Sequence, residues 1–413
     1  MSALIILTAL AAQGATPPPT TTSPSETSAE PKVGRTSYLD IEGGAGYSTN
    51  PLLSITNDDG AGFGRIALHA VHARVSARTT TVLSGYAENV AYTNHYGSQQ
   101  SLAFNARHDS AVSERLRLFA DAVATYDKGG QLDTRIIGTP NVPPLPGTPG
   151  GPPVLLPPGS DFLSVTGRTY RFAGHVGAQL AVSQRDSLTL SSGVDRVVFR
   201  GANDTSFTTV PVQVGYDRKL NERTTIGARI RAEDTEYNGP ASLRTVTPQL
   251  TGSFILAPRL TLSAAVGASF ARIDDGVSIR HSTGLAADAN LCGRSERSQY
   301  CARAAVDQQT ATTAGPAKSQ TFGVDYSHRL DEDSTLQFSL SASHYSSPIS
   351  IVSGRTFSQA TYYRGAAAYT RRISDRWFGG VNLAARKLTQ AGTDPKADLN
   401  GSVFVRYRFG DLQ

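Results

Sequence analysis

The stretch RLRLFADAVATY, residues 115–126, decides the fold class because its side chains alternate between two faces. One face is entirely apolar or aromatic and consists of Leu116, Leu118, Ala120, Ala122, Ala124 and Tyr126. The opposite face includes Arg115, Arg117, Asp121 and Thr125. A period of two is the pattern of a β-strand. The stretch exceeds the five or six residues usual in soluble sheets and is long enough to cross a bilayer as a tilted strand.

The same alternation recurs along the chain in about sixteen segments. They lie near residues 37–47, 62–75, 80–93, 98–110, 115–127, 161–183, 187–200, 205–218, 223–237, 243–256, 259–273, 318–329, 334–346, 356–371, 376–387 and 396–409. Short connections such as 76–79 and 329–333 alternate with longer ones such as 128–160 and 274–317. The sequence therefore predicts an all-β protein, a transmembrane antiparallel up-and-down β-barrel with short periplasmic turns and long extracellular loops.

The composition agrees with a barrel and excludes other classes. Of 413 residues only 18% are charged and 39 are glycine, which is unlike an average soluble enzyme. No run of eighteen apolar residues occurs, so membrane-spanning helices are excluded. The 33 arginines greatly outnumber the six lysines and are spread along the strand-like segments instead of forming one basic patch. We therefore expect no nucleic-acid partner.

The chain divides into four parts. Residues 1–15 contain an apolar run followed by small residues, which predicts a signal peptide; the alternative is a buried N-terminal strand or helical turn. Residues 16–36 are rich in Pro, Thr and Ser and predict a disordered periplasmic linker. Residues 37–409 form the barrel, and residues 410–413 are a short C-terminal tail. Export through a signal peptide predicts the outer membrane of a Gram-negative bacterium.

If the apolar face meets lipid, the polar face lines a lumen. The pore-lining arginines expected from this alternation are Arg115, Arg117, Arg171, Arg229, Arg231, Arg386, Arg406 and Arg408. An arginine on the lipid face at mid-depth would cost about 2–4 kcal/mol. An excess of arginine favours the passage of anionic solutes or acidic sugars. The alternative is that the arginines pair with acids such as Asp121, Asp195, Asp217 and Glu233 and only support the wall.

Two loops carry distinctive residues. The proline-rich stretch 128–160 is either a stiff insert that narrows the pore mouth or a disordered surface loop. Cys292 and Cys301 lie in the longest expected loop, 274–317. In an exported protein such a pair predicts a disulfide.

The sequence gives no support for an enzyme, a cofactor or a metal. His69 and His72 are three residues apart, so on a strand their rings lie on opposite faces. Neither a GxSxG elbow, nor a P-loop, nor an HExxH motif occurs. His281 near the two cysteines does not complete a metal site.

Short motifs at both ends of the expected barrel carry a family resemblance. The last strand places Tyr407 and Phe409 on one face, which resembles the C-terminal signal read by the barrel-assembly machinery, although four residues follow Phe409. Near the start, Gly44, Gly46 and Tyr47 precede Asn50, with Ser48 and Thr49 where an acidic residue is usual. Together with the strand rhythm, these motifs resemble outer-membrane β-barrel porin-like proteins associated with exopolysaccharide production.

The resemblance implies a passive conduit for secreted polysaccharide that acts with periplasmic export proteins. The leading expectation is therefore an outer-membrane pore for exopolysaccharide or anionic solutes. The alternative is a surface scaffold or adhesin whose long loops bind partners. In both cases the expected surroundings are outer-membrane lipid and lipopolysaccharide.

Overall fold

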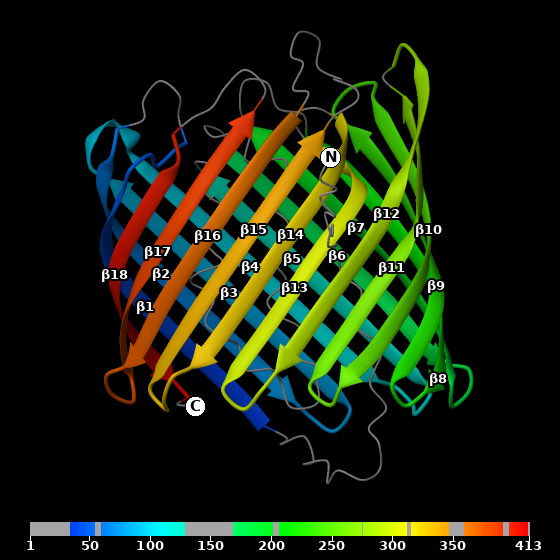
Figure 1. The fold of residues 1–413 in the computed structure, drawn as a ribbon, viewed down its shortest axis with the longest axis horizontal. Coiled ribbons are helices and arrows are strands. Elements are labelled where there is room, and N and C mark those ends of the chain that lie inside the picture. The colour runs from blue at the N-terminus through cyan, green and yellow to red at the C-terminus, as the bar shows by residue number, and fades with distance from the viewer. Residues whose placement is uncertain are drawn as a thin grey trace, which may run out of the picture.

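Eighteen antiparallel strands form a single sheet that closes on itself (Figure 1). This computed structural model describes residues 34–53, 59–128, 168–200, 206–274, 276–311, 315–346, 359–390 and 396–411. The strands are β1 Gly34–Ser48, β2 Ala61–Val75, β3 Thr79–Tyr92, β4 Ser98–Ala111, β5 Leu116–Lys128, β6 Arg168–Ala181, β7 Asp186–Arg200, β8 Phe207–Asn221, β9 Thr224–Tyr237, β10 Ser242–Ala257, β11 Leu260–Asp274, β12 Ile279–Arg294, β13 Ser298–Ala311, β14 Gly315–Arg329, β15 Ser334–Ser346, β16 Gln359–Arg372, β17 Trp377–Gln390 and β18 Asp398–Gly410. A short 3-10 helix, η1, spans Asn94–Tyr96.

The barrel is closed by pairing between its first and last strands. The β1–β18 ladder runs from Tyr38 opposite Gly410 to Ser48 opposite Asn400. Every other strand pairs with its neighbours in sequence, which is the up-and-down order that the short connections predict. Closure leaves no sheet edge between β1 and β18, as a hydrocarbon environment requires. Among the described residues, no helix is long and apolar enough to cross a membrane.

The sequence predicts about sixteen strands, whereas the structure contains eighteen; the two that were missed are β12 and β13. Each of the sixteen expected segments corresponds to a strand, but the stretch expected as the longest loop, 274–317, contains two more. Their lipid-facing positions mix large residues such as Leu285 with the small or polar Thr283 and Ala302, and their inward positions include the small residues Gly284 and Ala286. Small or polar side chains carry little hydrophobic alternation, so these strands resembled a loop.

Short turns occupy one rim and longer connections occupy the other. On the short-turn rim, a serine repeatedly begins the turn and accepts a hydrogen bond from the backbone three residues later. The Oγ atoms of Ser76, Ser113 and Ser183 accept from the N–H groups of Thr79, Leu116 and Asp186 at 2.9, 3.1 and 3.0 Å. This local bond supports the tight reversal between strands.

Both ends of the barrel lie at the short-turn rim. β1 begins there at Gly34, shortly before the expected start at residue 37, and β18 ends there at Gly410. The expected signal peptide, nearly all of the linker and the stretch 129–160 of the proline-rich loop lie outside the described residues, as do the last two residues of the tail.

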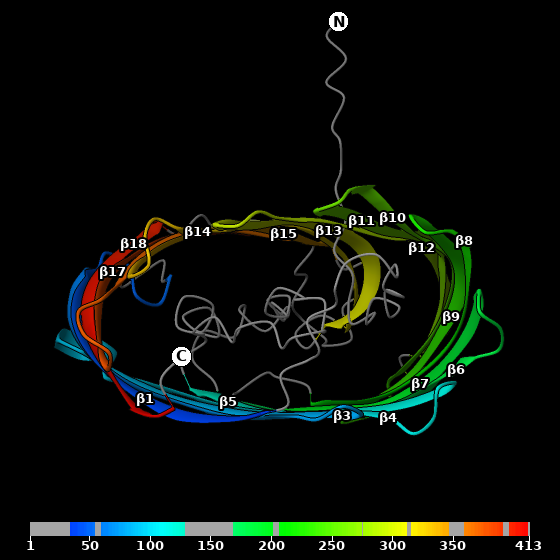
Figure 2. The ribbon, with the colours of Figure 1, turned by 90° about the horizontal axis from the view of Figure 1, so that it is seen from below.

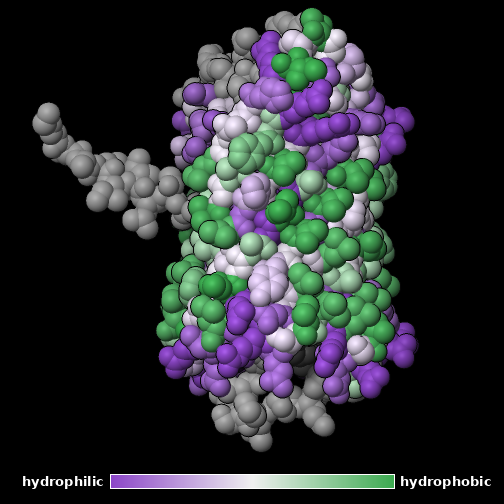
Figure 3. Space-filling view, turned by 90° about the vertical axis from the view of Figure 1, so that its right-hand side faces the viewer, coloured by the Kyte–Doolittle hydropathy of each residue, from purple (hydrophilic) through white to green (hydrophobic). Residues whose placement is uncertain are grey.

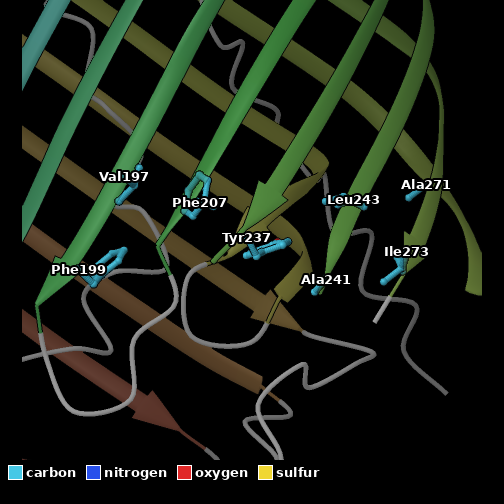
Figure 4. Packing of buried hydrophobic residues seen from close by; sticks show 8 residues of the cluster. All are labelled: Val197, Phe199, Phe207, Tyr237, Ala241, Leu243, Ala271 and Ile273. Atoms are coloured by element: carbon cyan, nitrogen blue, oxygen red, sulfur yellow. The ribbon is translucent and has the colours of Figure 1, made fainter. Parts of the chain in front are cut away.

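An apolar cluster on the inner side joins β7–β11 near the long-loop rim (Figure 4). Its members are Val197, Phe199, Phe207, Tyr237, Ala241, Leu243, Ala271 and Ile273. The rings of Phe207 and Tyr237 are 5.9 Å apart. These buried contacts pack the inner sides of five successive strands against one another at that rim.

Candidate functional site

The outer face of the wall is apolar. Leu250, Ile66, Val176 and Val403 are each 60–67% exposed, although they lie in the middle of regular strands. Figure 3 shows a hydrophobic band around one side of the barrel with hydrophilic residues above and below it. A continuous apolar surface of this kind is unstable in water and matches the hydrocarbon core of a bilayer. The candidate functional site is therefore the inner face.

The inner face carries all but one of the arginines expected to line a pore. Arg115 is the exception, because Ser113 Oγ accepts a hydrogen bond from its backbone N–H at 3.3 Å and places it in the turn before β5. The strand begins one residue later than the alternation predicts, so Arg115 does not extend the lumenal row. Figure 2 shows that the enclosed cross-section is oval, with β17 and β18 near one narrow end and β8 and β9 near the other.

A charged cluster lies at the seam where the barrel closes. Asp40 on β1 is 1% exposed and accepts hydrogen bonds from Arg408 Nε at 2.7 Å and Arg408 Nη2 at 2.8 Å. Arg406 lies 3.9 Å from the same carboxylate. The Arg408 guanidinium sits over the ring of Tyr38 at 4.1 Å, and that of Arg406 over Phe378 at 4.9 Å. Bidentate pairing and ring stacking hold both arginines against the wall.

A second network continues along the inner face onto β2 and β3. Arg65 donates from Nη1 to Glu42 and from Nε to Glu88, each at 2.6 Å. The Tyr86 hydroxyl donates to Glu88 and accepts from Arg65 Nη2 at 3.2 Å. One arginine thus faces two carboxylates. Arg65 was not among the predicted pore-lining arginines, although it lies on the inward-facing series of β2, between the outward positions Gly64 and Ile66.

The other narrow end holds a cluster that links β9 to β13. Arg229 donates to Gln249 at 2.8 Å and is paired with Asp288, which lies three strands away. Arg231 is paired with Glu233 at 3.1 Å and with Asp307 on β13. These contacts reach across intervening strands, so the inner faces of β9–β13 curve toward one another. The β12–β13 ladder extends only from Arg294 opposite Gln299 to Ala287 opposite Val306.

The remaining expected lumenal arginines are also paired. Arg171 donates from Nε to Asp195 at 3.1 Å, and Arg386 from Nε to Asp398 at 3.0 Å. Arg117 lies 2.9 Å from Asp109. Pairing across neighbouring strands is the arrangement that stabilises a sheet face carrying opposite charges. The lumen therefore presents guanidinium and carboxylate groups side by side.

The acids named in the sequence play different parts. Asp195 and Glu233 pair with arginines, as the supporting-wall alternative predicts. Asp121 lies 3.0 Å from His175 Nδ1, and Asp217 accepts from Thr251 at 3.4 Å. The partners Asp40, Asp288 and Asp307 were not predicted, because contacts between distant strands depend on the closure and curvature of the barrel.

Cys292 and Cys301 form a disulfide, as predicted, but they lie on two strands of the wall and not in a long loop. The two residues are directly opposed on β12 and β13, close to the short turn at residues 295–297. The bond therefore ties two wall strands near the short-turn rim and does not order a long surface loop. The described residues contain no group of three or more His, Cys, Asp or Glu that could hold a metal ion.

Aromatic side chains mark the outer face at the short-turn rim. Trp377 and Tyr407 rings are 4.8 Å apart, and Tyr407 and Phe409 rings 4.6 Å apart. Both pairs meet edge to face, where β17 begins and β18 ends. Aromatic rings at the border of an apolar band are typical of a membrane interface. Recognition of Tyr407 and Phe409 by an assembly machinery stays a prediction.

The closed sheet, its apolar outside and its charged inside define a transmembrane β-barrel. No protein-family model and no curated protein sequence matches the chain. Among solved structures it is similar to the FrpB iron transporter from Neisseria meningitidis (F5-1 variant), at 8% identity and a TM-score of 0.44, covering 90% of this chain and 82% of that one.

Two further solved structures are similar at the same level. OccK2 (OpdF) from Pseudomonas aeruginosa has 10% identity and a TM-score of 0.44, covering 92% of this chain and 98% of that one. The siderophore receptor PirA from Acinetobacter baumannii has 6% identity and a TM-score of 0.42, covering 92% and 81%. Such values describe a likeness of barrel architecture, and the class of this protein follows from its own wall and lumen.

Proposed function

We propose that this protein is a passive outer-membrane pore for carbohydrate, including the chains of an exopolysaccharide. The observation that carries the proposal is the inner face, where paired guanidinium and carboxylate groups lie at both ends of the oval, and the Tyr86 hydroxyl bonds to one of these pairs. An eighteen-stranded barrel is wide enough to enclose an aqueous channel. The apolar outer band supports the outer membrane as its location, because barrels of this type span that membrane.

The pairing of charges bears on the kind of solute. An excess of free arginine would favour anions. However, the lumenal arginines Arg408, Arg171, Arg229 and Arg386 are each paired with a carboxylate, from Asp40, Asp195, Asp288 and Asp398 respectively. Paired groups offer donors and acceptors next to each other at little net charge. Sugar hydroxyls both donate and accept hydrogen bonds, so carbohydrate fits this surface better than a simple anion does.

Liposome swelling tests the proposal directly. Vesicles containing the refolded barrel should swell in neutral sugars, at rates that fall as the sugar grows from a monosaccharide to longer oligosaccharides. Vesicles containing heat-denatured protein are the control. Absence of swelling with the smallest sugar would contradict a pore and leave a surface scaffold or adhesin as the better account.

The polysaccharide part of the proposal has a separate test in cells. Removing the gene should leave polymer synthesis intact and reduce the polymer found outside the cell, with a rise in the periplasm. Secretion at the normal level in the absence of the gene would refute export while leaving the diffusion pore in place.

A further inference from the structure

Three basic residues stand directly opposite one another on the outer face of β10–β12. Arg244 on β10 is the cross-strand partner of Arg272 on β11, and Arg272 is the partner of His281 on β12. All three are exposed. Side chains along a strand alternate between the inner and outer face. Because the adjacent residues Leu243, Ala271 and Ile273 are buried on the inner side, the three basic side chains point outward.

This basic row lies at the border of the apolar band. The next outward-facing residues of β10 and β11, toward the short-turn rim, are Val246 and Phe270. They lie opposite each other and are 45% and 50% exposed. Further along, Leu250 and Val266 continue the apolar surface. The row is therefore on the long-loop side of the apolar band, where β10 and β12 begin and β11 ends.

Acidic neighbours on the same outward face, Asp234, Glu236 and Asp274, neutralise the row only in part. Asp234 on β9 lies 3.3 Å from Arg244, but this pair is 48% and 66% exposed and contributes little. In the described part of the chain, no acid forms an ion pair with Arg272 or His281. Like charges directly opposite on a sheet are destabilising unless a counter-charge lies between them. Arg272 and His281 are therefore open to an anion supplied from outside the barrel.

We propose that Arg244, Arg272 and His281 bind a phosphate group of the outer-leaflet glycolipid, lipopolysaccharide. A ligand at this place must combine an anionic head with acyl chains, because Val246 and Phe270 lie directly below the basic row. Guanidinium groups bind phosphate through charge-assisted, often bidentate, hydrogen bonds. The proposal rests on the outer-membrane location proposed above, with the long-loop rim facing outward.

Native mass spectrometry of the purified full-length barrel with added lipid A tests this site. The double substitution Arg244→Gln and Arg272→Gln should weaken lipid A binding by about tenfold or more, since several charge-assisted hydrogen bonds are lost. The matched control is Arg35→Gln with Arg74→Gln, which removes another directly opposed, exposed arginine pair at the short-turn rim. This control should bind lipid A as the unaltered protein does.

Three competitors identify the source of the phosphate. Inorganic phosphate at millimolar concentration and phosphatidylglycerol should displace lipid A poorly, and a dephosphorylated lipid A should bind weakly. Equal binding by the Arg244/Arg272 variant and the unaltered barrel would overturn the proposal, as would displacement by inorganic phosphate alone. Liposome swelling by the same variant should be normal, so loss of this site is distinguishable from loss of the pore.

Discussion

Single side chains on this barrel are assigned to lipid or to lumen by their position in the strand, and the lumenal charges are then fixed by their partners. Asp40 is the clearest example, because it is almost fully buried and holds Arg408 by two hydrogen bonds across the closing seam. Removing one partner of a buried pair leaves the other charge uncompensated. The loss of folding stability should be largest where the pair also joins the first and last strands.

Replacing Asp40 by asparagine should lower the free energy of unfolding by about 3 kcal/mol. The measurement is urea unfolding in detergent micelles, followed by the fluorescence of Trp377, the single tryptophan of the chain. Asp234→Asn removes an exposed pair and serves as the control, with an expected change below about 1 kcal/mol. Equal unfolding midpoints for both variants would show that the seam does not depend on Asp40.

At the scale of the element, neighbouring residues of one strand face opposite environments. Leu340 on β15 is 56% exposed on the apolar side, while Ser339 lies opposite Asp325 on the inner side. Arginine at these adjacent positions therefore meets lipid in one case and a carboxylate in the other.

Leu340→Arg should destabilise the bilayer-inserted barrel by about 2–4 kcal/mol, whereas Ser339→Arg should have a much smaller effect. Both costs can be measured by equilibrium folding into lipid vesicles. Folded and unfolded barrels are then separated by their different migration in gels. A larger cost for Ser339→Arg than for Leu340→Arg would mean that the two faces of β15 are reversed.

The disulfide should matter most for the strands that it joins. The β12–β13 ladder is short, so loss of the Cys292–Cys301 bond should expose its backbone amides and cost about 2–3 kcal/mol. Hydrogen exchange of the Cys292→Ser, Cys301→Ser double variant should rise on both strands, while the fully paired β15 and β16 stay protected. Unchanged exchange at β12 and β13 would contradict this role.

Strand alternation predicted the barrel class, the two kinds of rim and the inward direction of arginines such as Arg229 and Arg408. It did not predict β12 and β13, because alanine-rich strands show little contrast between their faces. Arg115 was assigned to the lumen because the serine-led turn at Ser113 is not visible in an alternation of apolar and polar residues. The partners Asp40, Asp288 and Asp307 depend on strands brought together only by closure and curvature, so sequence proximity could not identify them.

At the scale of the whole molecule, closure turns eighteen alternating strands into one wall with lipid outside and paired charges inside. The oval interior, with charged clusters at both narrow ends, is the basis for treating the barrel as a channel. Because its arginines and acids compensate one another, the channel should discriminate weakly between cations and anions.

Single-channel recording in a planar lipid bilayer tests the claim of an open pore most directly. The purified barrel should give uniform conductance steps, with a reversal potential close to zero under a salt gradient because the lumenal charges are paired. Recordings in which folded, inserted protein produces no conductance steps would contradict the account.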